Sequence, residues 1–162
     1  MLLERNRMPF SKEMEDDFAA AVRSSDFAKV QAYLKQGLSP QVNSFFLRPV
    51  PFVAVEENAL DILKLLFEYG ADPFSGDQFE CNLLHISIQE LDSTCSDKIV
   101  GYVNKNFEKD IQDNLSIIQY LLKLGVSLTK KDKWGDTPLD YIQCCGDLLA
   151  PILKPYLEKD IV

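Results

Sequence analysis

The chain has 162 residues, of which 46% are apolar, and its formal net charge is −8. This length fits one domain or a short repeat array, and it excludes a protein of two full enzyme domains. The apolar content is sufficient for a buried core, which excludes a disordered chain, and the acidic balance disfavours a nucleic-acid partner and favours a basic protein partner.

Three helical segments of the chain each close on a glycine. They are residues 30–37, 62–70 and 117–125, and a degenerate fourth segment covers residues 148–157. In each segment Leu, Ile or Val recurs at steps of three and four residues, so one face of the helix is apolar and is expected to be buried. Glycine adopts the left-handed conformation that ends a helix at little cost. Gly37 and Gly70 are 33 residues apart, and Gly70 and Gly125 are 55 apart.

A second series of helices opens upstream of the closing positions. These helices begin at residues 50–54, 82–86 and 137–141. Pro51 and Pro138 fall in the first helical turn, where the amide that proline lacks has no helical partner, and Thr137 is able to cap the helix that follows it. The pattern therefore predicts paired helices that repeat, with a turn between successive pairs.

The third pair contains an insertion between its two helices. The opening of the first helix and the closing glycine are 19 residues apart in the second unit but 42 in the third, and the additional residues lie at about 93–112. Ile99, Val103 and Phe107 recur every four residues behind Ser96 and Asp97, which are able to cap a helix. We expect one short helix here and a further turn on the next helix. The insertion is either a functional contact or a tolerated surface loop.

These pairs resemble the ankyrin repeat. The residues that carry the match are Thr137-Pro138-Leu139 and Leu84-His85, similar to the family's helix-opening Thr-Pro-Leu-His, together with Gly70-Ala71-Asp72-Pro73 and the stretch 132–139. The resemblance covers about residues 14–157. It implies an all-α fold, namely a short ankyrin-type solenoid of about four helix-turn-helix repeats with a helical insertion in the third. The repeats are expected at about 14–42, 43–74, 77–129 and 132–158, within a single domain over residues 1–162.

Several units depart from the family pattern. The first keeps only its helices, and the second has Phe52-Val53 where the family has Leu-His. The last carries Pro151 and Pro155 in its second helix, where an interior proline costs about 3 kcal/mol. Degenerate ends are expected of an array, because each outermost repeat has only one neighbour.

Patterns for catalysis or metal binding are weak. The single histidine, His85, lies four residues after Cys81, and a thiol-dependent enzyme that uses this pair is the remote alternative. In the resemblance, His85 is the family's helix-opening histidine, whose ring ties neighbouring turn backbones together. No Cys-x-x-Cys pair exists, so we expect no zinc site and no cofactor. We also expect buried, reduced thiols, with at least one of Cys144 and Cys145 buried.

The compartment is predicted from the same features. Residues 1–7 lack the apolar stretch of a signal peptide, and no apolar run approaches the roughly 18 residues that span a bilayer. Together with reduced cysteines, this predicts a cytoplasmic protein.

Aromatic residues mark a candidate binding surface. Phe46, Phe79 and Trp134 lie four or five residues before the helix-opening positions, and the resemblance places them in turns that project like fingers. Aromatic side chains on rigid turns are typical of binding hot spots, although such rings also pack on one another to stiffen the turns. Polar and charged residues are expected at the rim and along the concave groove of the first helices: Arg48, Asp77, Lys133, Asp136, Glu57, Gln89, Glu90 and Gln143.

The resemblance implies a non-catalytic protein that binds a protein partner. We expect a monomer with neither a nucleic-acid nor a membrane partner. A dedicated inhibitor or immunity-type antidote of a basic protein is the preferred function, because the chain is small and acidic. A general scaffold or a host-targeting effector is the alternative.

Overall fold

A computed structural model describes residues 10–44, 48–99, 101 and 105–158 of the chain. Within these residues the fold is all-helical, as predicted, apart from one isolated β-bridge between Asn43 and Pro49. The elements in chain order are α1 (Lys12–Arg23), α2 (Phe27–Gln36), α3 (Val50–Glu56), α4 (Leu60–Glu68), α5 (Leu83–Ile99), α6 (Phe107–Leu124), the 3-10 turn η1 (Pro138–Tyr141) and α7 (Gly146–Leu157).

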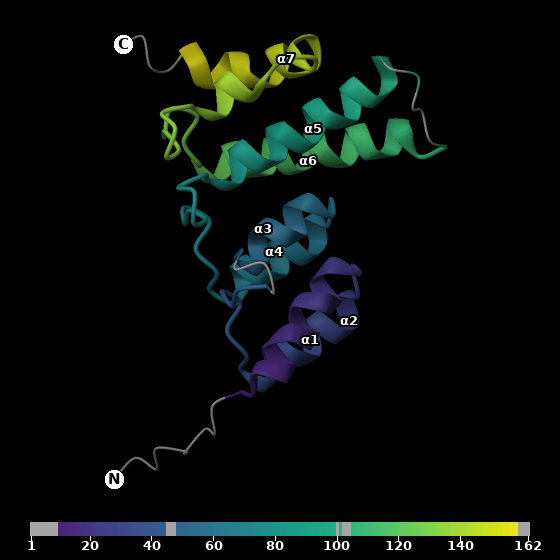
Figure 1. Cartoon of the computed structure of the whole chain (residues 1–162), viewed down its shortest axis with the longest axis vertical. Helices are drawn as coiled ribbons and strands as arrows, with labels where there is room; N and C mark the ends of the chain where they lie inside the picture. Colours follow the sequence, from purple (N-terminus) through teal and green to yellow (C-terminus); the bar gives the residue numbers. More distant parts are fainter. Residues whose placement is uncertain (1–9, 45–47, 100, 102–104, 159–162) are drawn as a thin grey trace.

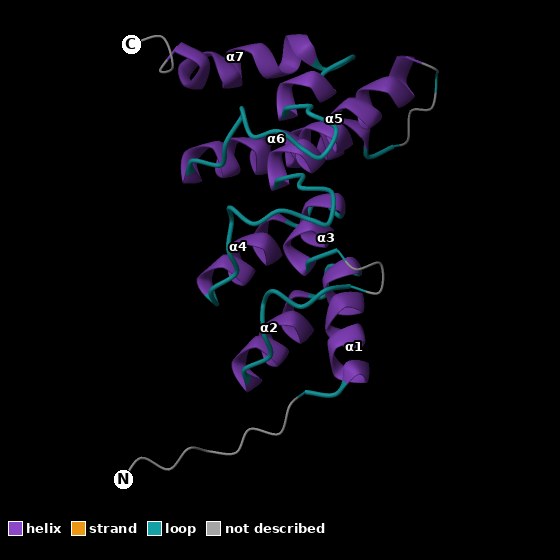
Figure 2. Ribbon diagram, turned by 60° about the vertical axis from the view of Figure 1, so that its left-hand side comes forward, coloured by secondary structure: helices purple, strands orange, loops and turns teal. Residues whose placement is uncertain are grey.

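The helices stack in two rows. Successive pairs, from α1 and α2 to η1 and α7, follow one another along the long axis of the molecule (Figure 1). In the first row α1 contacts α3, α3 contacts α5, and α5 contacts η1; in the second, α2 contacts α4, α4 contacts α6, and α6 contacts α7. We name these the inner and the outer row, and Figure 2 shows α1 and α3 on one side of the stack and α2 and α4 on the other. Contacts between adjacent pairs along both rows define a solenoid.

The helix ends follow the local sequence. Asp26 caps α2, because its side chain accepts a hydrogen bond from the amide of Lys29 at 3.0 Å. Gly37 and Gly125 end α2 and α6 with φ of +95° and +86°, the left-handed conformation that glycine adopts without strain. Two of the glycines from which the repeat is predicted are therefore helix-closing residues.

One apolar core runs through the stack. Phe18, Phe52 and Leu84 of the inner row are completely buried, and so are Leu63 and Ile118 of the outer row. All five belong to the same connected cluster of buried side chains. Each pair thus buries its apolar faces against its neighbours, because a single pair is too small to enclose a core.

The insertion differs from its prediction. Among the described residues no separate helix forms between α5 and α6; instead α5 continues to Ile99, and α6 begins at Phe107. Ser96 and Asp97 lie inside α5 and cap nothing, because α5 contains no glycine or proline that would stop it. The predicted lengthening of the next helix is confirmed, since α6 has 18 residues and α4 has 9. Val103 lies outside the described residues.

The last pair is the most irregular. The helix predicted from Thr137 onwards is only the 3-10 turn η1, which ends at Tyr141. Its start is capped as expected, because Asp140 Oδ2 accepts a hydrogen bond from the amide of Thr137 at 2.7 Å. α7 contains both Pro151 and Pro155, at exposed positions of this terminal helix.

A carboxylate from the lengthened α5 holds the loop between η1 and α7. Asp92 Oδ1 accepts hydrogen bonds from three consecutive amides, those of Gln143 (2.8 Å), Cys144 (2.6 Å) and Cys145 (3.1 Å). Cys145 is the N-cap residue of α7 and makes no side-chain cap bond. Burial alone raises the pKa of Asp92, but the amide hydrogen bonds more than offset it, so the pKa lies below its ordinary value of 3.8. Asp92 therefore caps α7 from another helix.

We expect Asp92→Ala to lower the free energy of unfolding by about 2 kcal/mol at about pH 7, because three amides lose a charged acceptor. Since the pKa of Asp92 is lower in the folded chain than in the unfolded chain, this stabilisation is present above about pH 4 and is lost as the pH falls through the folded-state pKa. Urea unfolding at about pH 7 and about pH 3 measures both effects. Asp147→Ala, in the first turn of α7, is the matched control. Equal destabilisation by both variants would contradict the capping role of Asp92.

Candidate functional site

Three loops between successive pairs are closed by the same backbone hydrogen bond. In each, an amide donates to the carbonyl oxygen four residues later: Ser44 to Arg48 (2.8 Å), Asp77 to Cys81 (3.0 Å) and Asp132 to Asp136 (2.8 Å). We name these loops finger 1 (residues 43–49), finger 2 (residues 76–82) and finger 3 (residues 131–137). Phe46, the aromatic residue predicted for finger 1, lies outside the described residues.

A buried aspartate supports finger 2 and another supports finger 3. Asp77 Oδ1 accepts a hydrogen bond from the amide of Phe79 at 2.9 Å, and Asp132 Oδ1 accepts one from the amide of Trp134 at 2.8 Å. The sequence predicts Asp77 at the exposed rim, but the structure places it inside finger 2 with a fully buried side chain. Its carboxylate is used to satisfy loop amides, so it holds the aromatic residue in place rather than facing a partner.

The tips of fingers 2 and 3 meet in an aromatic pair. The ring centroids of Phe79 and Trp134 are 5.6 Å apart, and the amide of Lys133 donates to the carbonyl oxygen of Phe79 at 3.0 Å. The Lys133 ammonium lies over both rings, 4.0 Å from the centroid of Phe79 and 4.4 Å from that of Trp134. The rings stiffen the adjoining fingers, yet Trp134 remains 61% exposed. An exposed aromatic side chain on an immobilised loop is suited to contact another macromolecule.

His85 ties finger 3 to α5. Its ring is completely buried; Nδ1 accepts a hydrogen bond from the amide of Asn82 at 3.0 Å, and Nε2 lies 3.2 Å from the carbonyl oxygen of Asp136. The ring of Tyr141 meets the His85 ring edge-on, and its hydroxyl donates to Asp132 Oδ2 at 2.7 Å. The predicted role of His85 as a bridge between turns is confirmed.

Cys81 and His85 lack the properties of a catalytic pair. Burial raises the pKa of the Cys81 thiol above its ordinary value of 9.0, which opposes formation of a thiolate. Both ring nitrogens of His85 are already used in contacts with finger residues. Cys145 is buried and Cys144 is exposed, as expected of this pair. In the described part of the chain, no cluster of three or more His, Cys, Asp or Glu side chains is arranged to hold a metal ion.

The buried ring of His85 predicts a loss of stability in mild acid. Burial lowers the pKa of His85 from its ordinary value of 6.5, so its contribution to stability is present above about pH 6.5 and is lost as the pH falls through the folded-state pKa. The slope is at most about 1.4 kcal/mol per pH unit. Glu90 acts in the opposite sense, because burial raises its pKa. Since the chain has one histidine, urea unfolding of wild type and His85→Gln between about pH 5 and about pH 7.5 isolates the effect. Identical pH dependence in both would contradict it.

Charged side chains line the inner row beside the fingers. Arg48 forms an ion pair with Glu56, and Arg23 lies 3.1 Å from Glu57. Burial raises the pKa of Glu90 above its ordinary value of 4.5, and the nearby carboxylate of Glu56 adds to this effect. This part of the surface therefore carries more carboxylates than cations.

Three hollows bring most of the predicted residues together. Hollow A, of about 450 Å³, is lined by Arg23, Ser44, Arg48, Glu56, Gln78 and Phe79. Hollow B, of about 350 Å³, is lined by Trp134, Asp136, Asp140, Tyr141 and Gln143. Hollow C, of about 390 Å³, is lined by Gln89, Asp92, Ser93, Ser96, Asp97, Tyr141 and Gln143. The aromatic pair joins hollow A to hollow B, and B and C share two residues, so the three form a series along the fingers and the inner row.

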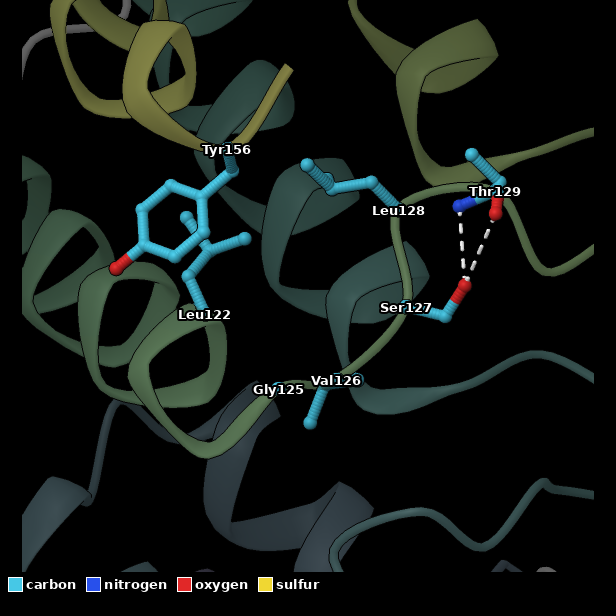
Figure 3. Close-up of a pocket in the computed structure, with 7 residues that line it drawn as sticks. All are labelled: Leu122, Gly125, Val126, Ser127, Leu128, Thr129 and Tyr156. Atoms are coloured by element: carbon cyan, nitrogen blue, oxygen red, sulfur yellow. Dashed lines mark hydrogen bonds between the residues drawn. The ribbon is translucent and has the colours of Figure 1, made fainter. Parts of the chain in front are cut away.

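A further hollow of about 220 Å³ lies between the end of α6 and α7 (Figure 3). Leu122, Leu128 and Tyr156 border it, and Ser127 Oγ accepts a hydrogen bond from the amide of Thr129 at 3.1 Å beside it. No residue of the predicted surface lines this hollow. We assign no binding role to it.

Some residues of this surface are absent from the sequence prediction. Arg23 lies 33 residues before Glu56, and Glu56 lies 33 before Gln89, so the repeat period was sufficient to find it. Asp92 and Tyr141 owe their places to contacts between units, for which the sequence has no local signal. The predicted Glu57, Glu90 and Lys133 lie near the hollows without lining them: two carry the charges described above, and the third covers the aromatic pair.

Known proteins provide an independent comparison. No protein-family model matches the chain. An ankyrin repeat protein of fowlpox virus (strain NVSL) is 26% identical over 132 residues, which are 75% of this chain and 18% of the relative. The crystal structure of the ankyrin repeat domain of Bcl-3, a member of the IκB protein family, matches with a TM-score of 0.59 and 20% identity, covering 82% of this chain and 50% of that one. The chain thus spans less than a fifth of the viral relative and half of the Bcl-3 chain.

The stacked pairs, the fingers and the bridging His85 agree with both similarities. The chain belongs to the ankyrin-repeat family.

Proposed function

We propose that the chain is a non-catalytic protein–protein interaction module, and that it binds its partner through fingers 2 and 3 and the inner row. The observation that carries the proposal is Trp134, which is 61% exposed and is held against Phe79 between two hollows. A solenoid that buries its core between neighbouring pairs keeps this face rigid in the free protein, which reduces the entropy lost on binding.

The proposed partner has a basic surface. The chain carries a net charge of −8, and carboxylates outnumber cations along the inner row. We propose a dedicated inhibitor or immunity-type antidote that docks on such a protein, because opposite charges accelerate encounter and exclude acidic competitors. A general scaffold or a host-targeting effector is the alternative, and it would bind several unrelated partners.

The cytoplasm is the proposed site of action, with the chain monomeric until it binds. In the described residues no helix combines the length and apolarity needed to cross a membrane. Cys81, Cys95 and Cys145 are buried and unpaired, which fits a reducing compartment.

Affinity capture from the native source, followed by mass spectrometry, tests the proposal. A single basic protein recovered in equal amounts with the chain supports the antidote function. Many unrelated partners in lesser amounts would support the scaffold instead. Recovery of an acidic partner would contradict the charge argument.

The association rate of the captured partner is expected to fall by roughly tenfold or more as salt is raised from about 0.02 M to about 0.5 M. The reason is that salt screens the long-range attraction that steers a basic protein to an acidic surface, while it affects short-range packing much less. Stopped-flow mixing across this range measures the rate. A rate that is independent of salt would remove the support for a basic partner.

A further inference from the structure

A polar stripe follows one face of α5 through the insertion. Gln89, Asp92, Ser93, Ser96 and Asp97 line hollow C, and their spacing of three and four residues places them on one side of the helix. The earlier turns of α5 are apolar where they join the core, for example at Leu84 and Ile88. A face built to pack on another helix of the same chain would continue that apolar pattern. This stripe does not.

The stripe lacks a neighbouring helix in the inner row because the last pair is shortened. η1 has four residues and contacts α5, after which the loop from Ile142 is drawn to Asp92 and leads into α7. α5 has 17 residues, so most of its length runs past η1. Figure 1 shows α5 and α6 extending beyond the other helices at one end. The insertion and the shortened pair thus open hollow C between them.

The joined hollows B and C are acidic. Asp92, Asp97, Asp136 and Asp140 line them, and neither is lined by a lysine or an arginine. Asp92 and Asp140 already accept hydrogen bonds from backbone amides. Asp97 and Asp136 side chains have no hydrogen-bond or ion-pair partner in the described part of the chain. Trp134 stands at the edge of hollow B.

We propose that hollows B and C form a docking surface for an arginine side chain in a basic segment of the protein partner. Arginine fits this surface better than lysine, because its planar guanidinium stacks on an aromatic ring and donates several hydrogen bonds to carboxylates at once. The inference rests on the proposed function and deepens it, since it gives the insertion a role as one wall of the binding surface. A second copy of this chain is a poor occupant, because two molecules of charge −8 repel each other.

The test uses short peptides as probes of the isotope-labelled full chain by NMR. One peptide alternates arginine with glycine, and its control replaces each arginine by the uncharged isostere citrulline. We expect the arginine peptide to shift amide signals of residues 89–97 and 141–143, and the citrulline peptide to leave them unchanged. Asp97→Asn weakens binding by about threefold or more, whereas Glu68→Gln, which removes the same charge from the outer row, leaves it within error.

Equal shifts with both peptides, shifts confined to the outer row, or equal weakening by both variants would overturn the docking surface. Its failure is distinguishable from failure of the proposed function. If the arginine peptide does not bind but Trp134→Ala still weakens the captured partner, only the docking surface is wrong. If Trp134→Ala leaves partner binding intact, the proposed function itself is wrong.

Discussion

Replacing Trp134 by alanine is expected to weaken binding of the captured partner by about 2 kcal/mol, which is roughly 30-fold in Kd. The side chain is 61% exposed in the free protein, while its backbone is fixed by Asp132 and its ring by Phe79. It therefore buries apolar area on binding without first losing much conformational freedom. Because so little of it is buried in the free chain, the thermal midpoint of unfolding should change by only a few degrees at most.

Tyr69→Ala is the matched control for this substitution. Tyr69 is an aromatic residue at the end of α4 in the outer row and is 39% exposed. Its truncation removes a comparable surface from a part of the molecule that the proposal leaves free. Titration calorimetry with both variants measures the two affinities. If Trp134→Ala lowers the melting temperature while its affinity equals that of wild type, the ring is a structural support and the binding surface is wrongly placed.

Replacing His85 by alanine is expected to cost about 3 kcal/mol in the free energy of unfolding at about pH 7.5. The ring is completely buried between α5 and finger 3, so its removal leaves a cavity and two polar groups, the Asn82 amide and the Asp136 carbonyl, without their partner. The loss should also loosen finger 3, because His85 is its link to α5. Partner affinity is then expected to fall as well, with the arrangement of Trp134.

Tyr141→Phe separates the two consequences. It keeps the ring that meets His85 edge-on and removes only the hydroxyl that donates to Asp132. We expect a loss of about 1 kcal/mol, because one hydrogen bond to a buried carboxylate is removed. Urea unfolding measures both variants. An unfolding midpoint of His85→Ala equal to that of wild type would contradict the bridging role of the ring.

The repeat could be predicted from sequence because its signals are local. The apolar periodicity of each helix and the closing glycines at 37 and 125 act within a few residues of chain, and the structure places both glycines at left-handed helix ends. The short helix expected within the insertion does not form, because Ser96 and Asp97 are as compatible with the interior of a helix as with its start. Contacts with α6 extend α5 past them, and this is a tertiary effect.

The candidate site could be predicted only in part. Trp134 and Phe79 are recognisable from their position before a helix opening, but the exposure of a charged residue is not. Asp77 reads as a rim residue and is an internal support, because a loop with unpaired amides attracts a carboxylate. Asp92 reaches amides that are 51 to 53 residues away, so no local pattern connects them. Hollow C, which depends on that contact, becomes visible only in three dimensions.

The most direct test of the binding surface is amide hydrogen exchange of the chain, alone and saturated with its captured partner. The account predicts that protection on binding is concentrated in residues 77–82, 89–97 and 132–143, while the outer-row helices α2 and α4 exchange as in the free chain. Protection confined to α2, α4, α6 and α7, with fingers 2 and 3 unchanged, would contradict it.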